Sequence, residues 1–323
     1  MSNKFGALLV THVIGGATPD TTAPTVVITS TASSPTALTT IAMTITFSEA
    51  VTGFLVGDIT ISAGSLANFA GSGAVYTVDW TMVAYANTMN IAAGVCVDGA
   101  GNANLAATQF AMTCSYFWFL AGGVTAANCI VAYQPIGAAN IAASYINHAN
   151  PGTYNANPVV APTFNTATGW TFNGTTMYLD TGYVPANTSE RSMIVKIASA
   201  DVSATKRMVC GSRNSSAQYH IRNTSDTSKA TFFHGGNAGV EVTNVASGVL
   251  AIAKLDAYVD GVDVGNITGS NFDQGTETVK VGNVTNITLN SPFSGQIHAF
   301  AVYAVTITPA QVVAITAAVN ALP

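Results

Sequence analysis

The stretch KLDAYVDGVDVGNITGSNFDQGTETVKVGNVTNITLNSPFSGQIHAFAVY, residues 254–303, decides the fold of this chain. Apolar and polar residues alternate over 255–264 on either side of Asp260-Gly261, a dipeptide typical of the two-residue turn of a β-hairpin. Two further strand-like runs follow at 278–284 and 293–304. The stretch therefore predicts antiparallel β-structure in the C-terminal part of the chain.

Composition limits the classes of function. At 323 residues the chain is long enough for two domains, and only 8% of the residues are charged, against about 25% in an average soluble domain. The formal net charge is −5, and no Lys or Arg occurs between Lys4 and Arg191. Because nucleic-acid binding depends on Lys and Arg contacts with phosphates, we expect no nucleic-acid partner. No apolar run reaches the ~18–20 residues that span a bilayer, so we also expect no membrane span.

Residues 1–18 precede the first strand pattern. Their single Lys and short apolar stretch resemble a signal peptide, but His12 interrupts the stretch. We interpret residues 5–14 instead as a strand or extended arm that docks onto another protein of an assembly. The alternative is a cleaved leader of a secreted protein.

The next part of the chain shows the pattern of an antiparallel sandwich. Short alternating strands are separated by Gly, Ser and Asn turns, as in such sandwiches. The phrases APTVVITS, ITFSEAVTGF, DITISAGSLANFAGSG and AAGVCVDGAGNAN resemble, in this order, the bacterial Ig-like domains of large surface proteins. The resemblance implies an Ig-like β-sandwich over residues 19–112 that acts as a rigid spacer. We expect its strands at 25–30, 41–47, 58–62, 75–82 and 88–95.

A calcium site is one interpretation of the acids in this part. The loop from Asp98 to Asn102, with Asp20 and Asp58, could supply the oxygen ligands that calcium takes from loops. Asp and Asn in Gly-rich turns more often hydrogen-bond to their own backbone. We therefore favour structural turns and expect no cofactor, with calcium as the alternative.

The cysteines do not form a metal-binding or redox motif. Cys96, Cys114, Cys129 and Cys210 include no CxxC pair and no spacing suited to zinc. We expect free, buried thiols, and a disulfide between Cys114 and Cys129 is the alternative.

A second domain is expected over residues 113–323. It opens with the most aromatic segment of the chain, which includes CSYFWFL at 114–120. The motifs GWTFNGTTMYLDTGY (169–183), FSGQI (293–297) and ITPAQV (307–312) resemble laminin G-like domains of the concanavalin A-like class, although Gln311 replaces the usual acid. The resemblance implies a two-sheet jelly roll that recognises a ligand rather than an enzyme. Further strands are expected at 191–198, 207–211, 217–222, 229–234 and 238–243.

A short helix is expected at the end of this domain. Thr308 can cap it, Pro309 suits the first helical position, and Gln311 completes a capping box. The predicted fold class is thus all-β: an N-terminal Ig-like β-sandwich followed by a concanavalin A-like jelly roll with a short C-terminal helix. Trp170, Phe172 and Tyr178 are interpreted as packing residues rather than a platform for a sugar.

No catalytic constellation is evident, so we expect a protein that is not an enzyme. Glucanases of the concanavalin A-like class pair carboxylates at alternate positions of one strand, and no E-x-D-x-E run occurs. Asp256, Asp260 and Asp263 belong to the predicted hairpin. The five histidines are scattered along the sequence, at positions 12, 148, 220, 234 and 298.

The most plausible ligand-binding surface is the loop-rich rim of the jelly roll. Its candidate residues combine aromatic faces with hydrogen-bond donors, as sugar sites do: Tyr219, His220, Arg222, His234 and Asn237. The alternative is that members such as Tyr219 and Phe233 simply face the core.

Two functional hypotheses follow. In the preferred one, this is a non-enzymatic surface protein of a virus particle, most plausibly a tailed bacteriophage, as a capsid decoration, fibre or tail-associated protein. It would bind other virion proteins through its N-terminal arm and host-surface glycans through its head. The alternative is a secreted bacterial adhesin or carbohydrate-binding protein. A homo-oligomer is compatible with both, although no coiled-coil heptads enforce it.

Overall fold

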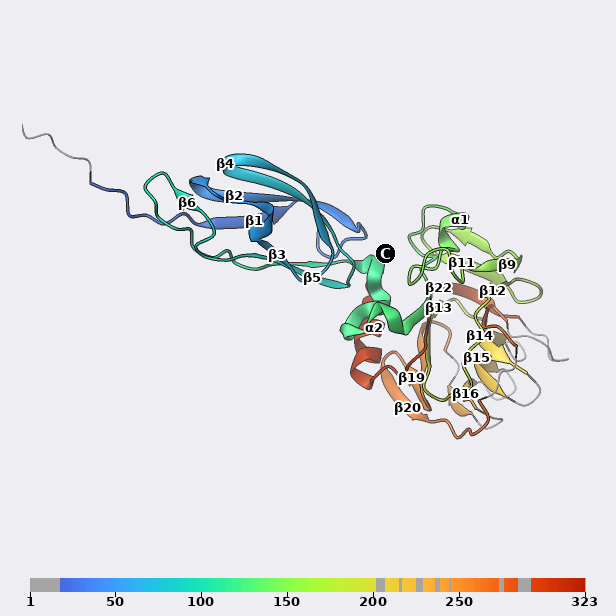
Figure 1. Cartoon of the computed structure of the whole chain (residues 1–323). Coiled ribbons are helices and arrows are strands. Elements are labelled where there is room, and N and C mark those ends of the chain that lie inside the picture. Colours follow the sequence, from blue (N-terminus) through green and yellow to red (C-terminus); the bar gives the residue numbers. More distant parts are fainter. Residues whose placement is uncertain are drawn as a thin grey trace, which may run out of the picture. The chain divides into compact units, whose positions relative to one another are not determined.

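The computed structural model describes residues 18–201, 207–214, 217–224, 229–235, 239–243, 245–272, 276–283 and 292–322. The docking arm expected at 5–14 lies outside these residues. The described chain divides into two compact units (Figure 1). The first unit contains residues 18–33, 40–81 and 88–111, and the second contains residues 34–39, 82–87 and 112–322.

The first unit is built from two small antiparallel sheets. One sheet has the order β1-β2-β4, with β6 also paired to β2, and the other has the order β3-β5-β7. Alternate side chains of β2 face inward, and Ile41, Met43, Ile45 and Phe47 are at most 3% exposed. This period of two follows from the pleat of a strand with one buried face. The elements are β1 (Val26–Ser30), β2 (Thr40–Thr52), η1 (Val56–Asp58), β3 (Ile59–Ile61), β4 (Ser65–Thr81), β5 (Ala86–Ile91), β6 (Val97–Asp98) and β7 (Phe110–Thr113).

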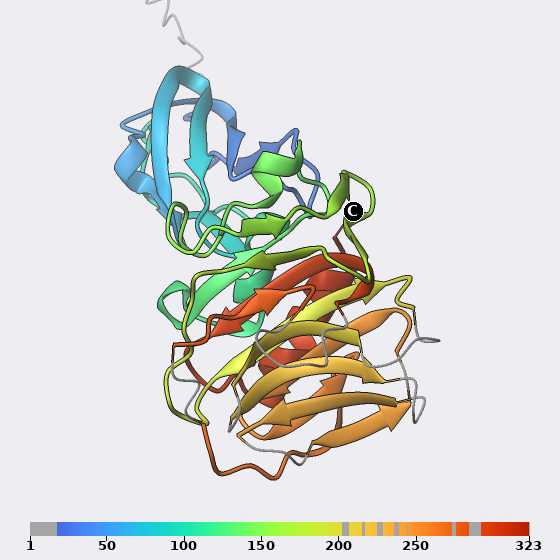
Figure 2. The same ribbon diagram turned by 90° about the vertical axis from the view of Figure 1, so that its right-hand side faces the viewer.

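The second unit contains two larger antiparallel sheets, whose strands are seen in Figure 2. The first has the order β10-β11-β22-β13-β18-β19-β20, with β8 also paired to β22, and the second has the order β17-β16-β15-β14-β21-β12-β9. Their strands are β8 (Cys129–Tyr133), β9 (Asn157–Val160), β10 (Thr163–Asn165), β11 (Gly169–Asn173), β12 (Tyr178–Asp180), β13 (Ser192–Ala198), β14 (Arg207–Arg213), β15 (Gln218–Thr224), β16 (Lys229–His234), β17 (Val240–Thr243), β18 (Gly248–Ala253), β19 (Asp256–Val259), β20 (Val262–Asn266), β21 (Lys280–Val281) and β22 (Ser294–Tyr303).

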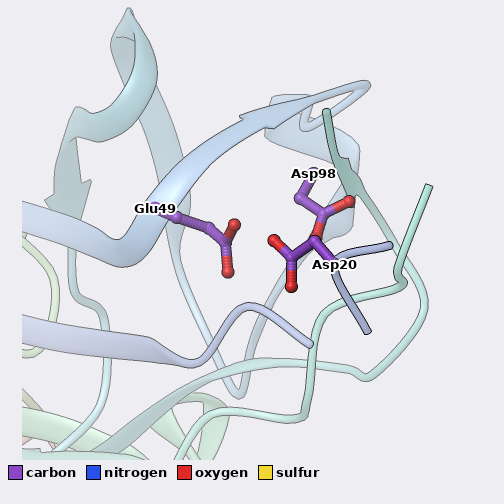
Figure 3. Close-up of side chains that lie close together, drawn as sticks. All are labelled: Asp20, Glu49 and Asp98. Carbon is purple, nitrogen blue, oxygen red and sulfur yellow. The ribbon is translucent and has the colours of Figure 1, made fainter. Parts of the chain in front are cut away.

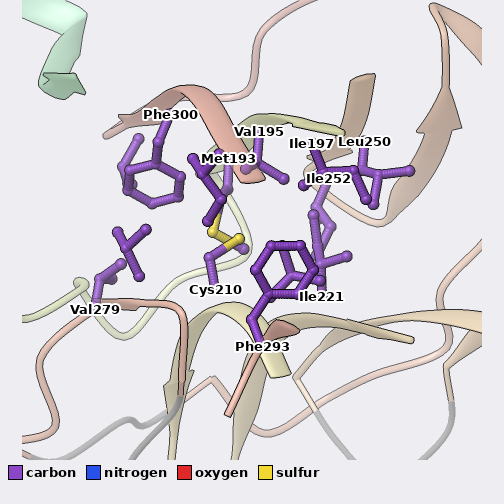
Figure 4. Packing of buried hydrophobic residues seen from close by; sticks show 14 of the residues in the cluster. Met193, Val195, Ile197, Cys210, Ile221, Leu250, Ile252, Val279, Phe293 and Phe300 are labelled. Carbon is purple, nitrogen blue, oxygen red and sulfur yellow. The ribbon is translucent and has the colours of Figure 1, made fainter. Parts of the chain in front are cut away.

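The main core of the second unit lies between its two sheets (Figure 4). Met193, Val195 and Ile197 alternate along β13 and pack in one cluster with Cys210 of β14 and Ile221 of β15. Burial of such side chains contributes ~1.5–3 kcal/mol each. This core holds the strands that carry the polar residues described below.

A second cluster covers the other face of the first large sheet. Small residues such as Ala251 and Ala299 line this face and pack with Val312 and Ile315 of the C-terminal helix. Small side chains let the helix axis come close to the strands. The short helical elements are η2 (Ser115–Gly123), η3 (Ala126–Asn128), α1 (Ile141–Ser144) and α2 (Pro309–Asn320).

The predicted capping box at the start of the C-terminal helix and the predicted turn of the hairpin are both confirmed. The Thr308 hydroxyl accepts a bond from Gln311 N at 3.3 Å, and Gln311 Oε1 accepts one from Thr308 N at 2.9 Å. Asp260 and Gly261 join β19 to β20 with φ values of 49° and 81°. Both angles lie in the left-handed region that this turn type requires.

The predicted fold class is confirmed: the chain is all-β, with two sandwich units and a short C-terminal helix. Trp170 and Phe172 are packing residues, 0% and 2% exposed, and Tyr178 is half-buried. The four cysteines are free and buried. Within the described part of the chain, the helices are all too short to cross a bilayer.

Candidate functional site

The residues expected at an exposed rim do not lie at one. Tyr219, His220 and His234 are all 0% exposed: Tyr219 and His220 lie near the start of β15 and His234 ends β16, but both are inner strands of the second large sheet. Arg222 is half-buried, and Asn237 lies outside the described residues. The rim placement of the three buried residues is therefore corrected. Tyr219 and His220 are neighbours in β15, so their side chains point to opposite faces of the sheet. Both are buried, which means that both faces of the strand are covered at this point.

Two of these residues form an internal polar cluster around Arg191, here called the Arg191 cluster. Arg191 is 1% exposed, and its Nε donates to Nε2 of His234 at 3.0 Å. Its Nη1 donates to the Ala186 carbonyl and its Nη2 to the Phe272 carbonyl. The guanidinium lies over the Tyr219 ring, 4.5 Å from its centroid. The cation is thus held by acceptors and a π face.

The protonation state of His234 follows from its contacts. Nε2 accepts the bond from Arg191, so the ring proton is on Nδ1, which lies against the Lys254 carbonyl. Burial, reinforced by the Arg191 charge, lowers the pKa of His234 from 6.5 to about 4. The Arg191 cluster is therefore a buried part of the core in which the Arg191–His234 pair is hydrogen-bonded, while the Tyr219 hydroxyl has no partner among the described residues, and its role is structural.

His220 follows Tyr219 in β15, so its side chain points to the opposite face of the sheet. Its ring stacks on Phe233 with centroids 4.7 Å apart, and the Arg222 guanidinium lies 4.4 Å from the Phe233 centroid. Burial and the nearby Arg213 and Arg222 charges hold the pKa of His220 well below its usual value. His220 is neutral at physiological pH as a result.

A pocket of about 270 Å³ lies elsewhere in the second unit, here called the Tyr116 pocket. Its polar and aromatic walls are Tyr116, Gln134 and His148. The rings of Tyr116 and His148 stack in parallel, with centroids 4.3 Å apart and planes 7° apart. The remaining lining residues are small or apolar: Ala37, Gly137, Ala138, Ala143 and Ile146.

Backbone and side-chain hydrogen bonds hold the walls of this pocket. His148 N donates to the Ala132 carbonyl at 2.8 Å, which joins the histidine to β8. The neighbouring Asn147 is 0% exposed, accepts from Ala132 N at 2.8 Å and donates to Ile130 O at 2.8 Å. Trp170 Nε1 donates to the Ser144 hydroxyl at 2.7 Å and so fixes α1. The pocket is consequently built on a rigid frame.

Two acceptor atoms at the Tyr116 pocket have no hydrogen-bond partner among the described residues. They are Oε1 of Gln134 and Nδ1 of His148. Burial lowers the pKa of His148 to about 4, while a hydrogen bond to the Tyr116 backbone opposes this shift. Both unpaired atoms are covered by protein, so they belong to the packing around the pocket rather than to its open surface.

Sequence reasoning did not find this pocket. His148 is one of five histidines scattered along the sequence, and no motif includes Gln134. The aromatic segment at 114–120 was the available signal, because Tyr116 belongs to it. Only the fold brings Tyr116, Gln134 and His148 together.

The first unit contains a group of three acids, shown in Figure 3. One carboxylate oxygen from each of Asp20, Glu49 and Asp98 lies within 4.8 Å of the others. Asp98 is 4% exposed and accepts bonds from Ala100 N and Asn102 N, both at 2.8 Å. Asp58 is not part of the group and instead accepts from Leu55 N at 2.7 Å.

The electrostatics of these acids agree with the structural-turn interpretation of the loop. Hydrogen bonds from Asn102 lower the pKa of Asp98, which stays ionised. Burial raises the pKa of Glu49, and the charges of Asp98 and Asp20 raise it further. The Asp98 carboxylate is already used by the amides of its own turn.

The three acids of the hairpin also have structural contacts. Asp260 Oδ1 accepts from Val249 N at 2.8 Å, and Asp263 Oδ1 accepts from Gly265 N at 2.9 Å. Asp256 accepts from the amide of Asn266. These contacts account for the acids as parts of the turn and its strands.

Comparison with known proteins finds a family match over the N-terminal part of the chain. Residues 20–114 match the family profile of the bacterial Ig-like domain, which supports the resemblance read from that part of the sequence. No curated protein matches the chain.

Among solved structures, a Trypanosoma rangeli sialidase bound to 2,3-difluorosialic acid is similar at 10% identity and a TM-score of 0.43, over 61% of this chain and 34% of that chain. The binding domain of botulinum neurotoxin DC in complex with SialylT is similar at 11% identity and a TM-score of 0.43, over 62% of this chain and 52% of that chain. The chain thus spans about a third of the first protein and about half of the second.

Proposed function

We propose that this chain is a non-enzymatic surface protein in which the Ig-like unit is a spacer and the second unit is a lectin-like head that adheres to cell-surface glycans. One observation carries the proposal: two β-sandwiches follow each other, and the second has a pocket lined by the stacked rings of Tyr116 and His148. Aromatic faces beside a few polar atoms are typical of small-ligand sites.

The laminin G-like resemblance of the head supports recognition rather than catalysis. Its motifs GWTFNGTTMYLDTGY and FSGQI supply β11, β12 and the start of β22. These strands position core residues, and Trp170 and Phe172 are buried there. The resemblance therefore concerns the scaffold, which presents binding loops and pockets.

The setting that we propose is the surface of a virus particle, with residues 5–14 docking onto another virion protein. The low share of charged residues, 8%, supports this setting, since the surface is built from small uncharged polar residues. A secreted bacterial adhesin of the same architecture is the second candidate, and the match to bacterial Ig-like domains favours it.

Two measurements test the proposal. Mass spectrometry of purified virus particles and of culture supernatant will show where the natural protein occurs and at which residue it begins. A chain beginning at Met1 or Ser2 in particles supports the virion setting, and a chain beginning near Ala17 in the supernatant supports the adhesin. Binding of the full chain to a glycan array tests adhesion, and an array without any bound glycan would contradict it.

A further inference from the structure

We infer that the surface around Tyr154 binds a neutral oligosaccharide of at least two sugar rings. The inference rests on the proposed glycan adhesion and gives it a place and a ligand class. It is argued from the exposed Tyr154 side chain, the amide groups beside it, the single carboxylate there and the two cavities that Tyr154 lines. These cavities have no lining residue in common with the Tyr116 pocket.

The backbone of Tyr154 is held in a conformation that tyrosine rarely adopts. Its φ angle is 55°, in the left-handed region, and the hydroxyl of the buried Tyr133 donates to its carbonyl. A bulky residue in this region costs free energy, and such residues gather at functional sites. Glycine or asparagine would adopt this backbone more easily, so the turn itself does not require a tyrosine.

The Tyr154 side chain is exposed, and its orientation is fixed. The residue is 38% exposed. Its ring lies edge-to-face with the ring of Tyr183, which is buried, with centroids 5.5 Å apart and planes at 70°. The exposed part of the ring is therefore held in place before any ligand arrives. A sugar can pack its apolar C–H face on such a ring at a low ordering cost.

A hydrogen-bond donor with a fixed direction lies beside this ring. Asn155 Oδ1 accepts from Asn147 N at 2.9 Å and from Gly152 N at 3.4 Å. These two bonds orient the amide, whose Nδ2 is exposed and has no partner among the described residues. Asn157 is also exposed, and its side chain makes no hydrogen bond within the described part of the chain. Both amides can therefore donate to the hydroxyl oxygens of a ligand.

An acceptor lies in the same cavity as these donors. Asp180 stands opposite Asn157 in the pairing of β9 with β12, and both residues line the larger cavity. Asp180 Oδ1 accepts from Gly182 N at 2.8 Å, and its Oδ2 lies 3.5 Å from Nζ of Lys280. A carboxylate offers about four acceptor positions, so Asp180 can also accept from a sugar hydroxyl.

The charge of the surface favours a neutral ligand. Among the described residues that line the two cavities, Asp180 alone is charged. Its side chain is 27% exposed and that of Lys280 is 6% exposed, so a ligand meets the carboxylate rather than the ammonium group. A sialic acid or a uronic acid would bring a second carboxylate close to Asp180, and the like charges would repel.

The two cavities set the size of the ligand. The larger, of about 490 Å³, contains the polar groups described above, and the smaller, of about 320 Å³, is lined mainly by small and apolar residues. Pockets of about 300 Å³ or more hold drug-sized ligands, so each cavity has room for at least one sugar ring. Because Tyr154 lines both cavities, a chain of two rings can occupy both and contact this side chain.

The experiment uses the full chain and isothermal titration calorimetry. The probes are lactose, maltose and cellobiose as neutral disaccharides, the methyl glycosides of galactose and glucose as single rings, and sialyllactose as the charged form of lactose. At least one disaccharide should bind, with a Kd roughly 3–10-fold lower than that of the matching single ring, as one added hydrogen bond gives. Sialyllactose should bind no more tightly than lactose.

Two substitutions place the binding at Tyr154. Tyr154→Asn removes the ring and suits the left-handed backbone, so Kd should rise at least about tenfold while Tm should not fall. Asn155→Asp keeps the Oδ1 that holds the turn and removes the Nδ2 donor, so Kd should rise roughly 3–10-fold.

The matched control for Asn155→Asp is Asn165→Asp. Asn165 is exposed, its Oδ1 accepts from Ala167 N at 2.8 Å, and it lines neither cavity. The control adds the same charge to the same unit and keeps the local hydrogen bond. Its Kd should equal that of the native chain.

The outcomes separate this inference from the proposed adhesion, which binding of the full chain to a glycan array tests. If the array shows bound glycans but no disaccharide probe binds, or if both variants bind as tightly as the native chain, the Tyr154 assignment fails and adhesion stands. A lower Tm for Tyr154→Asn would show that the ring is held for packing and would also overturn the assignment.

The ligand class has its own contrary outcomes. Tighter binding of sialyllactose than of lactose would overturn the neutral class. Equal Kd values for a disaccharide and its single ring would overturn the size of the site. A blank array would overturn adhesion, and this inference with it.

Discussion

Two regions of the second unit use the same kinds of side chain in opposite ways. In the Arg191 cluster, Tyr219 and His234 surround a buried cation whose Nε, Nη1 and Nη2 each donate to an acceptor. In the Tyr116 pocket, Tyr116 and His148 stand beside Gln134, and two acceptors have no partner among the described residues. A tyrosine and a histidine together do not mark a binding site. Both regions also contain a covered polar atom without a partner, so the difference between them is that Tyr116 and His148 line a pocket, whereas Arg191 fills its own space in the core.

The strongest test of this contrast is Arg191→Met. It leaves Nε2 of His234 and the carbonyls of Ala186 and Phe272 without their donor inside the core. We expect the free energy of unfolding of the second unit to fall by roughly 3–5 kcal/mol. Urea denaturation followed by tryptophan fluorescence measures this. Arg213→Met is the control, since Arg213 is half-buried, and it should cost much less. Equal losses in the two variants would refute the structural role of the Arg191 cluster.

Acid should destabilise both regions in the same pH window. Burial lowers the pKa of His148 and of His234 from 6.5 to about 4. As pH falls, the unfolded chain takes up protons first, so stability is full above about pH 6.5 and is lost between pH 6.5 and pH 4. The fully buried His234 should account for at most ~3 kcal/mol of this loss. Melting temperatures measured from pH 7 to pH 4 check the direction, and a flat profile would contradict it.

Replacing each histidine by phenylalanine compares the two regions directly. His234→Phe removes the acceptor of Arg191 Nε and should cost ~1–3 kcal/mol. His148→Phe keeps a ring against Tyr116 and removes one unpaired atom together with the hydrogen bond to the Tyr116 backbone, so it should cost about 1 kcal/mol. Thermal unfolding at pH 7 provides the comparison. If His148→Phe proved the more damaging change, the pocket would be part of the structural core.

The smallest effect on stability is expected from Gln134→Leu. The variant replaces an amide whose Oε1 has no partner by an apolar side chain of similar length. The free energy of unfolding should stay within ~1 kcal/mol of that of the native chain, because no described hydrogen bond of Oε1 is lost. Calorimetry measures this. A large loss of unfolding free energy would mean that the Gln134 amide stabilises the fold.

Most of the architecture could be predicted from the sequence. The alternation along β2, the apolar runs of β13 and β22, the Asp260-Gly261 turn and the capping box around Thr308 are local patterns with local causes. The strands expected at 41–47, 191–198 and 229–234 correspond to β2, β13 and β16. Strand existence was predictable because the period of two and the turn residues are both visible in a short window.

The placement of single polar side chains could not be predicted in this way. Tyr219, His220 and His234 were expected at a rim, and they are buried because the strands that carry them lie in the middle of a sheet. A sequence shows which residues share a strand face, but the burial of that face depends on strand order, which long-range pairing decides.

The sequence alone was enough to predict an all-β chain, a first part similar to bacterial Ig-like domains, a β-hairpin around Asp260-Gly261 and a capped C-terminal helix. Each of these follows from residues that are near one another along the chain. The hydrogen bond between Arg191 and His234, and the pocket lined by Tyr116, Gln134 and His148, became visible only in the tertiary structure. The physical reason is that a site is made by side chains from separate elements, whose meeting depends on how the sheets pair and pack.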